Sequence, residues 1–192
     1  MSKPFILGIG GTTRPGSSSE LVLRAALREI EALGAETACL AGPDMVLPLY
    51  APEHPDRDPK AERLIELVRR ADGLVIASPG YHGSISGMIK NALDYVEDTS
   101  KDDRVYLDGR AVGCIACAYG WQATGSTLVA LRTIVHALRG WPTPLGVAAN
   151  TTSRLFGEGG DCNDKGLDAN LKVLASQVMH FVQLNANMRK SV

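Results

Sequence analysis

The residues that point most directly to chemistry lie in the segment 78–94, S-P-G-Y-H-G-S-I-S-G-M-I-K-N-A-L-D. Its first half is a loop that combines the aromatic Tyr81 with small residues and hydroxyls, and it holds no obvious acid–base pair. The apolar run 74–77 before it predicts a buried strand, and apolar residues recur at helical spacing after it. In open α/β sheets, ligands bind where a parallel strand ends. The segment therefore suits the binding of a planar cofactor better than hydrolysis.

A second loop, 8–19, reads G-I-G-G-T-T-R-P-G-S-S-S and also lies between an expected strand and an expected helix. A helix N-terminus offers free N–H groups and a positive dipole end, which favour a phosphate. Hydrogen-bond donors and one cation would complete the site: Thr12, Ser17, Ser18, Ser19 and Arg14. The loop predicts a site for one phosphate monoester. The alternative is an ordinary helix N-cap beside a solvated arginine, because serines are common caps.

Two nucleotide-binding motifs nearly fit this loop. The spacing from Gly11 matches a Walker A motif, but Ser17 stands where that motif needs lysine. The G-x-G-x-x-T run from Gly8 lacks the third glycine of the dinucleotide fingerprint, and the second strand ends at Ala41 without the carboxylate that binds the ribose. Neither a nucleoside triphosphate nor a classical NAD site is predicted.

The composition is that of an ordinary soluble protein. The chain has 192 residues, 45% of them hydrophobic and 21% charged, with a net charge of −1. We expect a single domain over residues 1–192, no nucleic-acid partner, no membrane association and a cytoplasmic location, because no basic surface, membrane-length apolar stretch or signal peptide is evident.

Strand and helix patterns alternate along the chain. Apolar runs predict strands at 5–9, 37–40, 74–77, 111–118 and 142–148, and helical periodicity predicts helices at 21–33, 61–71, 84–97, 124–138 and 167–185. The five prolines in 41–59 predict an irregular loop, and Pro142 and Pro144 place the fifth strand at a sheet edge. We expect an α/β flavodoxin-like three-layer sandwich with a five-stranded parallel sheet in the order 2-1-3-4-5, rather than the Rossmann order 3-2-1-4-5-6.

Cys114 and Cys117 match a C-x-x-C spacing. They fall in the expected strand 111–118, where residues three apart point to opposite faces of a sheet. Two small buried side chains are therefore expected there, rather than a redox pair, and no metal site is predicted.

The two loops together resemble the NAD(P)H-dependent FMN reductases of the flavodoxin-like superfamily. Residues 11–17, G-T-T-R-P-G-S, are similar to that family's G-S-x-R-x-x-S. Residues 79–95 are similar to its P-E-Y-N-G-S-I-P-G-x-L-K-N-A-L-D-W, and residues 107–112 to its L-x-G-K-P-V entry to the fourth strand. The likeness covers almost the whole chain.

The resemblance implies an FMN site made of three loops. The first would bind the phosphate through Thr12, Arg14, Ser17, Ser18 and Ser19. The second would line the ring and ribityl chain with Pro79, Gly80, Tyr81, His82, Gly83 and Ser84, and the third would add Ala118, Tyr119, Gly120 and Trp121.

Three positions depart from the family pattern. Gly80 replaces a common glutamate, His82 a common asparagine, and Y-G-W at 119–121 a more glycine-rich stretch. His82 is either a donor facing the flavin or a residue that packs the loop. Trp121 either covers the flavin or lies at a subunit interface.

The activity implied is hydride transfer from NADPH or NADH to FMN and then to a small-molecule electron acceptor such as free flavin or a quinone. No side chain is expected to act as a catalytic acid or base. A flavin-dependent monooxygenase as partner and a homodimer or homotetramer are further implications. The alternatives are a quinone or azo reductase on the same fold, an electron carrier of the flavodoxin type, and an α/β protein that has lost its cofactor. The near-neutral charge and Arg14 argue against the carrier.

Overall fold

The computed structural model describes residues 3–190. Its strands are β1 (Phe5–Gly10), β2 (Glu36–Ala41), β3 (Gly73–Tyr81), β4 (Ser84–Ile85), β5 (Ala111–Ala118), β6 (Trp141–Pro142) and β7 (Val147–Asn150). Its helices are α1 (Ser18–Ala32), α2 (Pro59–Arg70), α3 (Gly87–Asp94), α4 (Trp121–Ala137) and α5 (Lys165–Lys190), with short 3-10 helices η1 (Gly42–Met45) and η2 (Tyr95–Thr99).

The main sheet is parallel and runs in the order β2-β1-β3-β5-β6, with β7 also paired to β5. The predicted order 2-1-3-4-5 is therefore confirmed, but the fifth position holds two short strands in place of one strand over 142–148. The N–H groups of Trp141 and Thr143 bond to carbonyls of Arg110 and Val112, whereas Pro142 has no N–H to donate. An edge strand tolerates that gap, as expected.

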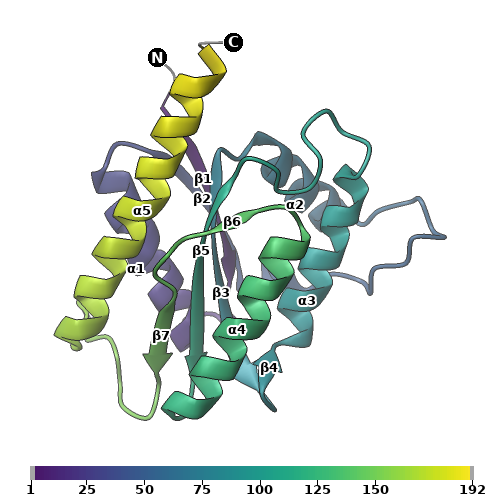
Figure 1. Cartoon of the computed structure of the whole chain (residues 1–192). Helices are drawn as coiled ribbons and strands as arrows, with labels where there is room; N and C mark the ends of the chain where they lie inside the picture. The colour runs from purple at the N-terminus through teal and green to yellow at the C-terminus, as the bar shows by residue number, and fades with distance from the viewer. Residues whose placement is uncertain (1–2, 191–192) are drawn as a thin grey trace.

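Helices cover both faces of the sheet, so the three predicted layers are present (Figure 1). The helices α1 and α5 pack over one face and contact residues such as Ile6 and Val75. The helices α2, α3 and α4 pack over the other face. Cys117 belongs to the first core and Cys114 to the second, which confirms that the two thiols lie on opposite faces. Burial raises the pKa of each to about 12, so both stay protonated.

One predicted helix boundary was wrong in the segment that carries the chemistry. The helix expected over 84–97 begins at Gly87, because Ser84 and Ile85 pair antiparallel with the end of β3. Ser86 caps α3 by accepting the N–H of Ile89. The strand β3 correspondingly runs on to Tyr81, beyond the predicted 74–77.

The other elements lie near their predicted positions. The helix α4 begins three residues before the predicted 124, and η1 interrupts the loop expected over 41–59. None of the helices in residues 3–190 combines the length and the apolar character that a membrane crossing demands.

Candidate functional site

The carboxyl end of β3 and the segments at the carboxyl ends of β1, β5 and β7 meet and enclose a hollow of about 160 Å³. Its lining includes ten predicted site residues: Thr12, Arg14, Ser17, Ser18, Ser19, Pro79, Gly80, Tyr81, Ala118 and Tyr119. Cys117 and Thr151 also line it. The tertiary structure thus joins segments more than a hundred residues apart in the chain.

A second, more open hollow of about 430 Å³ adjoins the first, because Tyr119 lines both. Three more predicted residues, Gly83, Gly120 and Trp121, line it with Gln122, Ala123 and Ser126. Tyr119 and Trp121 are 78% and 65% exposed, which is unusual for large aromatic side chains. His82 and Ser84 are exposed and line neither hollow.

The first loop is shaped by its glycines and hydroxyls. Gly11 and Gly16 have φ angles of +87° and +70°, which only glycine adopts readily. The Thr12 hydroxyl accepts the N–H of Arg14 at 3.2 Å. Ser17 is the N-cap of α1, with its Oγ accepting the N–H of Glu20. The Arg14 side chain is exposed and its guanidinium makes no hydrogen bond or ion pair within residues 3–190, so it is free to meet an anion.

The second loop is a two-residue hairpin turn between β3 and β4. His82 and Gly83 have φ angles of +51° and +84°, as in the type I′ turns that favour asparagine followed by glycine. The Ser78 hydroxyl fastens the base of the hairpin by accepting the N–H of Ser86 at 3.1 Å. Histidine also tolerates the left-handed region, which accounts for its presence at this position.

Gly80 is required by packing against α4. A Cβ atom there would lie 2.5 Å from the Thr127 hydroxyl and 3.0 Å from the Ala118 Cβ. Thr127 in turn donates to the carbonyl of Ser84 at 3.3 Å. A side chain at this position would therefore displace the Thr127 hydroxyl from its bond to Ser84.

The loop that follows β7 also contributes to the site and was not predicted from the sequence. The side-chain oxygen of Asn150 accepts the N–H groups of Gly120 at 3.3 Å and Thr152 at 3.1 Å, and the N–H of Thr151 bonds to the Ala118 carbonyl. These bonds tie the fourth loop to the third and place Thr151 in the lining of the first hollow. The only signal in the sequence was a polar N-T-T run at the end of the predicted edge strand.

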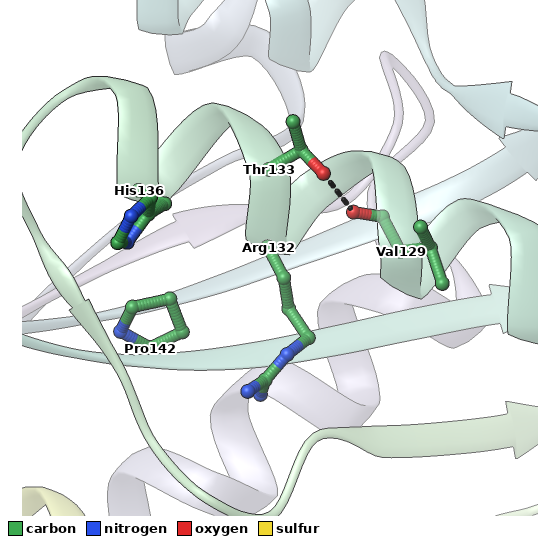
Figure 2. Close-up of a pocket in the computed structure, with 5 residues that line it drawn as sticks. All are labelled: Val129, Arg132, Thr133, His136 and Pro142. Carbon is green, nitrogen blue, oxygen red and sulfur yellow. Dashed lines mark hydrogen bonds between the residues drawn. The ribbon is translucent and has the colours of Figure 1, made fainter.

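A further hollow, of about 450 Å³, lies on α4 beside β6 (Figure 2). It is lined by Val129, Arg132, Thr133, His136 and Pro142. Pro142 pairs with Val112 near the start of β5, so this hollow lies at the opposite end of the sheet from the three loops. One guanidinium nitrogen of Arg132 also donates to the Thr143 carbonyl at 2.6 Å.

The residues of the first two hollows fit an amphipathic ligand. One end offers hydroxyls and an unpaired cation, which suit a phosphate, and the other offers aromatic surface, which suits a flat ring. A hollow of about 160 Å³ is smaller than the 300–1,000 Å³ usual for ligand pockets. Part of such a ligand therefore has to extend into the second hollow or to the surface. Within residues 3–190, no three His, Cys, Asp or Glu side chains are placed to hold a metal ion.

Known structures share this fold. The Paracoccus denitrificans flavoenzyme FerB, an NAD(P)H:(acceptor) oxidoreductase, superposes with a TM-score of 0.77 at 17% identity, covering 93% of this chain and 98% of that one. A flavodoxin from Streptococcus pneumoniae superposes with a TM-score of 0.63 at 10% identity, covering 92% and 98%. At such identities these matches establish the flavodoxin-like fold alone.

The sequence comparisons are more specific. An FMN-dependent NADPH-azoreductase of Staphylococcus aureus is 32% identical over 121 residues, which are 62% of this chain and 61% of the relative. The match thus spans about three fifths of that relative's length. The model of the family described as NADPH-dependent FMN reductase matches residues 4–153. Because this match covers most of the sequence and includes all three predicted loops, the chain belongs to the NADPH-dependent FMN reductase family.

Proposed function

We propose that this chain is an FMN-dependent reductase that oxidises NADPH, or NADH, and passes the electrons to a small-molecule acceptor. The observation that carries the proposal is the convergence of the three loops on two adjoining hollows, the first lined by the unpaired Arg14 and the second by the exposed aromatic side chains of Tyr119 and Trp121. Family membership supports the same function.

The phosphate of FMN is assigned to the first loop. Arg14 supplies the charge, and Thr12 and residues 17–19 supply hydroxyls that line the same hollow. Hydrogen bonds between charged partners are about twice as strong as neutral ones. A single cation with several hydroxyls matches a phosphate monoester better than the longer phosphate chain of a nucleoside triphosphate.

The ring and ribityl chain are assigned to the second and third loops. Pro79, Tyr81 and Ala118 line the first hollow, and Gly83 and Trp121 the second. Asn150 already uses the N–H of Gly120, so that donor is not available to the ring edge. The residues His82 and Ser84 stand outside both linings and act through the shape of the turn.

When bound, FMN would supply the hydride chemistry. The side chains of this site would hold the phosphate and flank the ring. Hydride transfer requires no general base, and the buried Cys117 thiol, whose pKa is raised to about 12, stays neutral at physiological pH.

The second hollow is the proposed acceptor and nicotinamide site. Its lining residues carry no lysine, arginine, aspartate or glutamate, and Tyr119 and Trp121 provide stacking surface. A neutral planar acceptor such as a quinone or an azo compound suits this lining better than an anion. The azoreductase among the relatives favours the azo compound as a second candidate.

We further propose a cytoplasmic homodimer or homotetramer. The exposure of Trp121 and Tyr119 beside the ligand hollows supports a subunit contact there, because large exposed aromatics mark interaction sites. A flavin-dependent monooxygenase remains a candidate protein partner.

The test of this function is the visible spectrum of the purified protein with FMN, recorded before and after anaerobic NADPH. We expect a bound-flavin spectrum that bleaches rapidly. Bound flavin that resists both NADPH and NADH would instead support an electron carrier, and failure to bind FMN would support a protein without cofactor. Turnover with menadione, an azo dye and free FMN then ranks the acceptors.

A further inference from the structure

A buried carboxylate lies against the first loop and has no part in the function proposed above. The side chain of Glu20, in the first turn of α1, is only 9% exposed. Its Oε2 accepts the N–H of Gly16 at 3.0 Å, and its Oε1 accepts the Nε of Arg24 at 2.8 Å. A buried carboxylate beside an expected phosphate site is unexpected, because like charges repel.

The geometry of this contact departs from an ordinary helix cap. In a capping box, the glutamate three residues after the N-cap returns to the N–H of the N-cap residue itself. Ser17 is the N-cap here, yet Glu20 reaches one residue further, to Gly16. The N–H of Ser17 is left without a hydrogen bond within residues 3–190, so it stays available to a ligand.

The same contact holds the loop in its left-handed turn. Gly16 has a φ of +70° and is exposed, and no atom lies within 4 Å of the point that a Cβ would occupy, so packing does not fix it. A Cβ added at Gly11 would lie 3.3 Å from the Glu20 Cβ, so a larger residue there would crowd Glu20. Glu20 therefore bonds to one of the two glycines that bound the loop and lies close to the other.

We propose that Glu20 is a positioning residue for the phosphate-binding loop 11–19, and that Arg24 keeps its charge from opposing the phosphate. This inference rests on the proposed function. Arg24 is paired with Glu20 on the adjacent turn, and the hydrogen bond to that carboxylate raises the Arg24 pKa above its ordinary value. The pair is therefore electrically neutral as a unit beneath the loop.

The experiment compares FMN with riboflavin, which lacks the phosphate, in the variants Glu20→Ala, Glu20→Gln and Arg24→Ala. We expect Glu20→Ala to weaken FMN binding about tenfold, which corresponds to one lost hydrogen bond, and to change riboflavin binding less than about twofold. Glu20→Gln keeps an acceptor for Gly16 and should stay within about threefold of the unmodified protein. Glu29→Ala, on the same helix but away from the loop, is the matched control.

Arg24→Ala leaves an unpaired carboxylate under the phosphate and should weaken FMN binding, whereas the double variant Glu20→Ala/Arg24→Ala should be no weaker than Glu20→Ala alone. Equal losses for FMN and riboflavin, a bound-flavin spectrum altered by Glu20→Ala, or an unchanged FMN affinity would overturn the inference. Melting temperatures identify a variant that fails to fold. If Glu20→Ala fails to fold, the FMN and riboflavin affinities of Glu20→Gln test the inference in its place. If the unmodified protein binds neither flavin, the proposed function itself fails, which is a separate result.

Discussion

Two arginines on the loops after β1 and β2 are used in opposite ways. Arg14 is exposed, and its guanidinium makes no hydrogen bond or ion pair within residues 3–190. Arg57 is held by Asp98 through two bonds of 2.6 and 2.8 Å, by the carbonyls of Ala51 and His54, and by cation–π contact with Tyr50 at 5.0 Å. Both loops are rich in proline or glycine, yet in the part of the chain that the structure describes only Arg57 forms hydrogen bonds to the rest of the protein through its guanidinium.

A structural arginine differs from one available to a ligand in whether its guanidinium is hydrogen-bonded to the protein. The loop around Tyr50 is further fastened to α3, where Asn91 accepts the Tyr50 N–H at 2.8 Å and donates to the Pro48 carbonyl at 2.8 Å. An arginine held by several hydrogen bonds to the protein stabilises the fold. An arginine whose guanidinium has no protein partner, and which lies beside hydroxyls and open N–H groups, is suited to bind an anion.

The largest effect is expected from Arg14→Ala. The variant should bind FMN about 10- to 100-fold more weakly, because a charge-assisted hydrogen bond contributes about 1.5–3 kcal/mol. Its melting temperature without ligand should stay within about 1 °C of the unmodified protein, because no protein contact is lost. Flavin fluorescence titration and thermal denaturation measure the two quantities. A large loss of stability would show that Arg14 is structural after all.

Arg57→Ala should show the reverse pattern. Breaking its contacts with Asp98 and the loop carbonyls is expected to lower the free energy of unfolding by about 2–3 kcal/mol, while FMN affinity changes less than about threefold. Urea denaturation of the ligand-free protein measures the first quantity. Loss of flavin binding in a variant that remains folded would contradict the distinction between the two loops.

The pH dependence of stability tests the structural role of the Arg57–Asp98 pair. The hydrogen bond from Arg57 holds the pKa of the Asp98 carboxyl below its ordinary value. A depressed pKa in the folded state stabilises the protein above the unfolded-state pKa of about 3.9, and this contribution is lost as pH falls through the folded pKa. The difference in free energy of unfolding between the unmodified protein and Asp98→Asn should be constant above about pH 5 and decrease below about pH 4. The control is Asp103→Asn, an exposed neighbour, whose difference should stay near zero.

The smallest effects are expected in the β3–β4 turn, a ligand-facing loop whose shape depends on backbone conformation. His82→Asn should leave FMN binding and stability within about twofold and 0.5 kcal/mol, because asparagine suits a φ of +51°. His82→Val should destabilise the protein by about 1–2 kcal/mol, because β-branched residues strain that conformation. Loss of activity in His82→Asn with FMN still bound would instead assign chemistry to the imidazole.

The strands and helices were largely predictable because their signals are local. Apolar periodicity and capping residues marked them, and Ala111–Ala118 was placed without error. The start of α3 was not predictable, because Ile85 continues the apolar spacing of the helix. In the structure, Ser84 and Ile85 instead pair with Tyr81 and Gly80. That pairing depends on the turn at His82, which competes with helix formation.

For the candidate site, glycines, hydroxyls and one arginine between an expected strand and an expected helix predicted a phosphate loop. The family and the FMN-binding residues came from the resemblance of the loop motifs to the FMN reductases, and the match to the family model confirms the family. The sequence also placed Pro142 on an edge strand, because proline lacks an N–H. It placed Cys114 and Cys117 on opposite faces of the sheet, because the side chains of a strand alternate between the two faces.

Only the tertiary structure decided which groups remained free. Arg57 is bonded to Asp98, whereas Arg14 has no such partner within residues 3–190. The Thr127 hydroxyl occupies the space beside Gly80, and Asn150 accepts the N–H of Gly120. Such outcomes depend on contacts between residues distant in the chain, and no local pattern encodes them, because each is set by how helices and strands pack together.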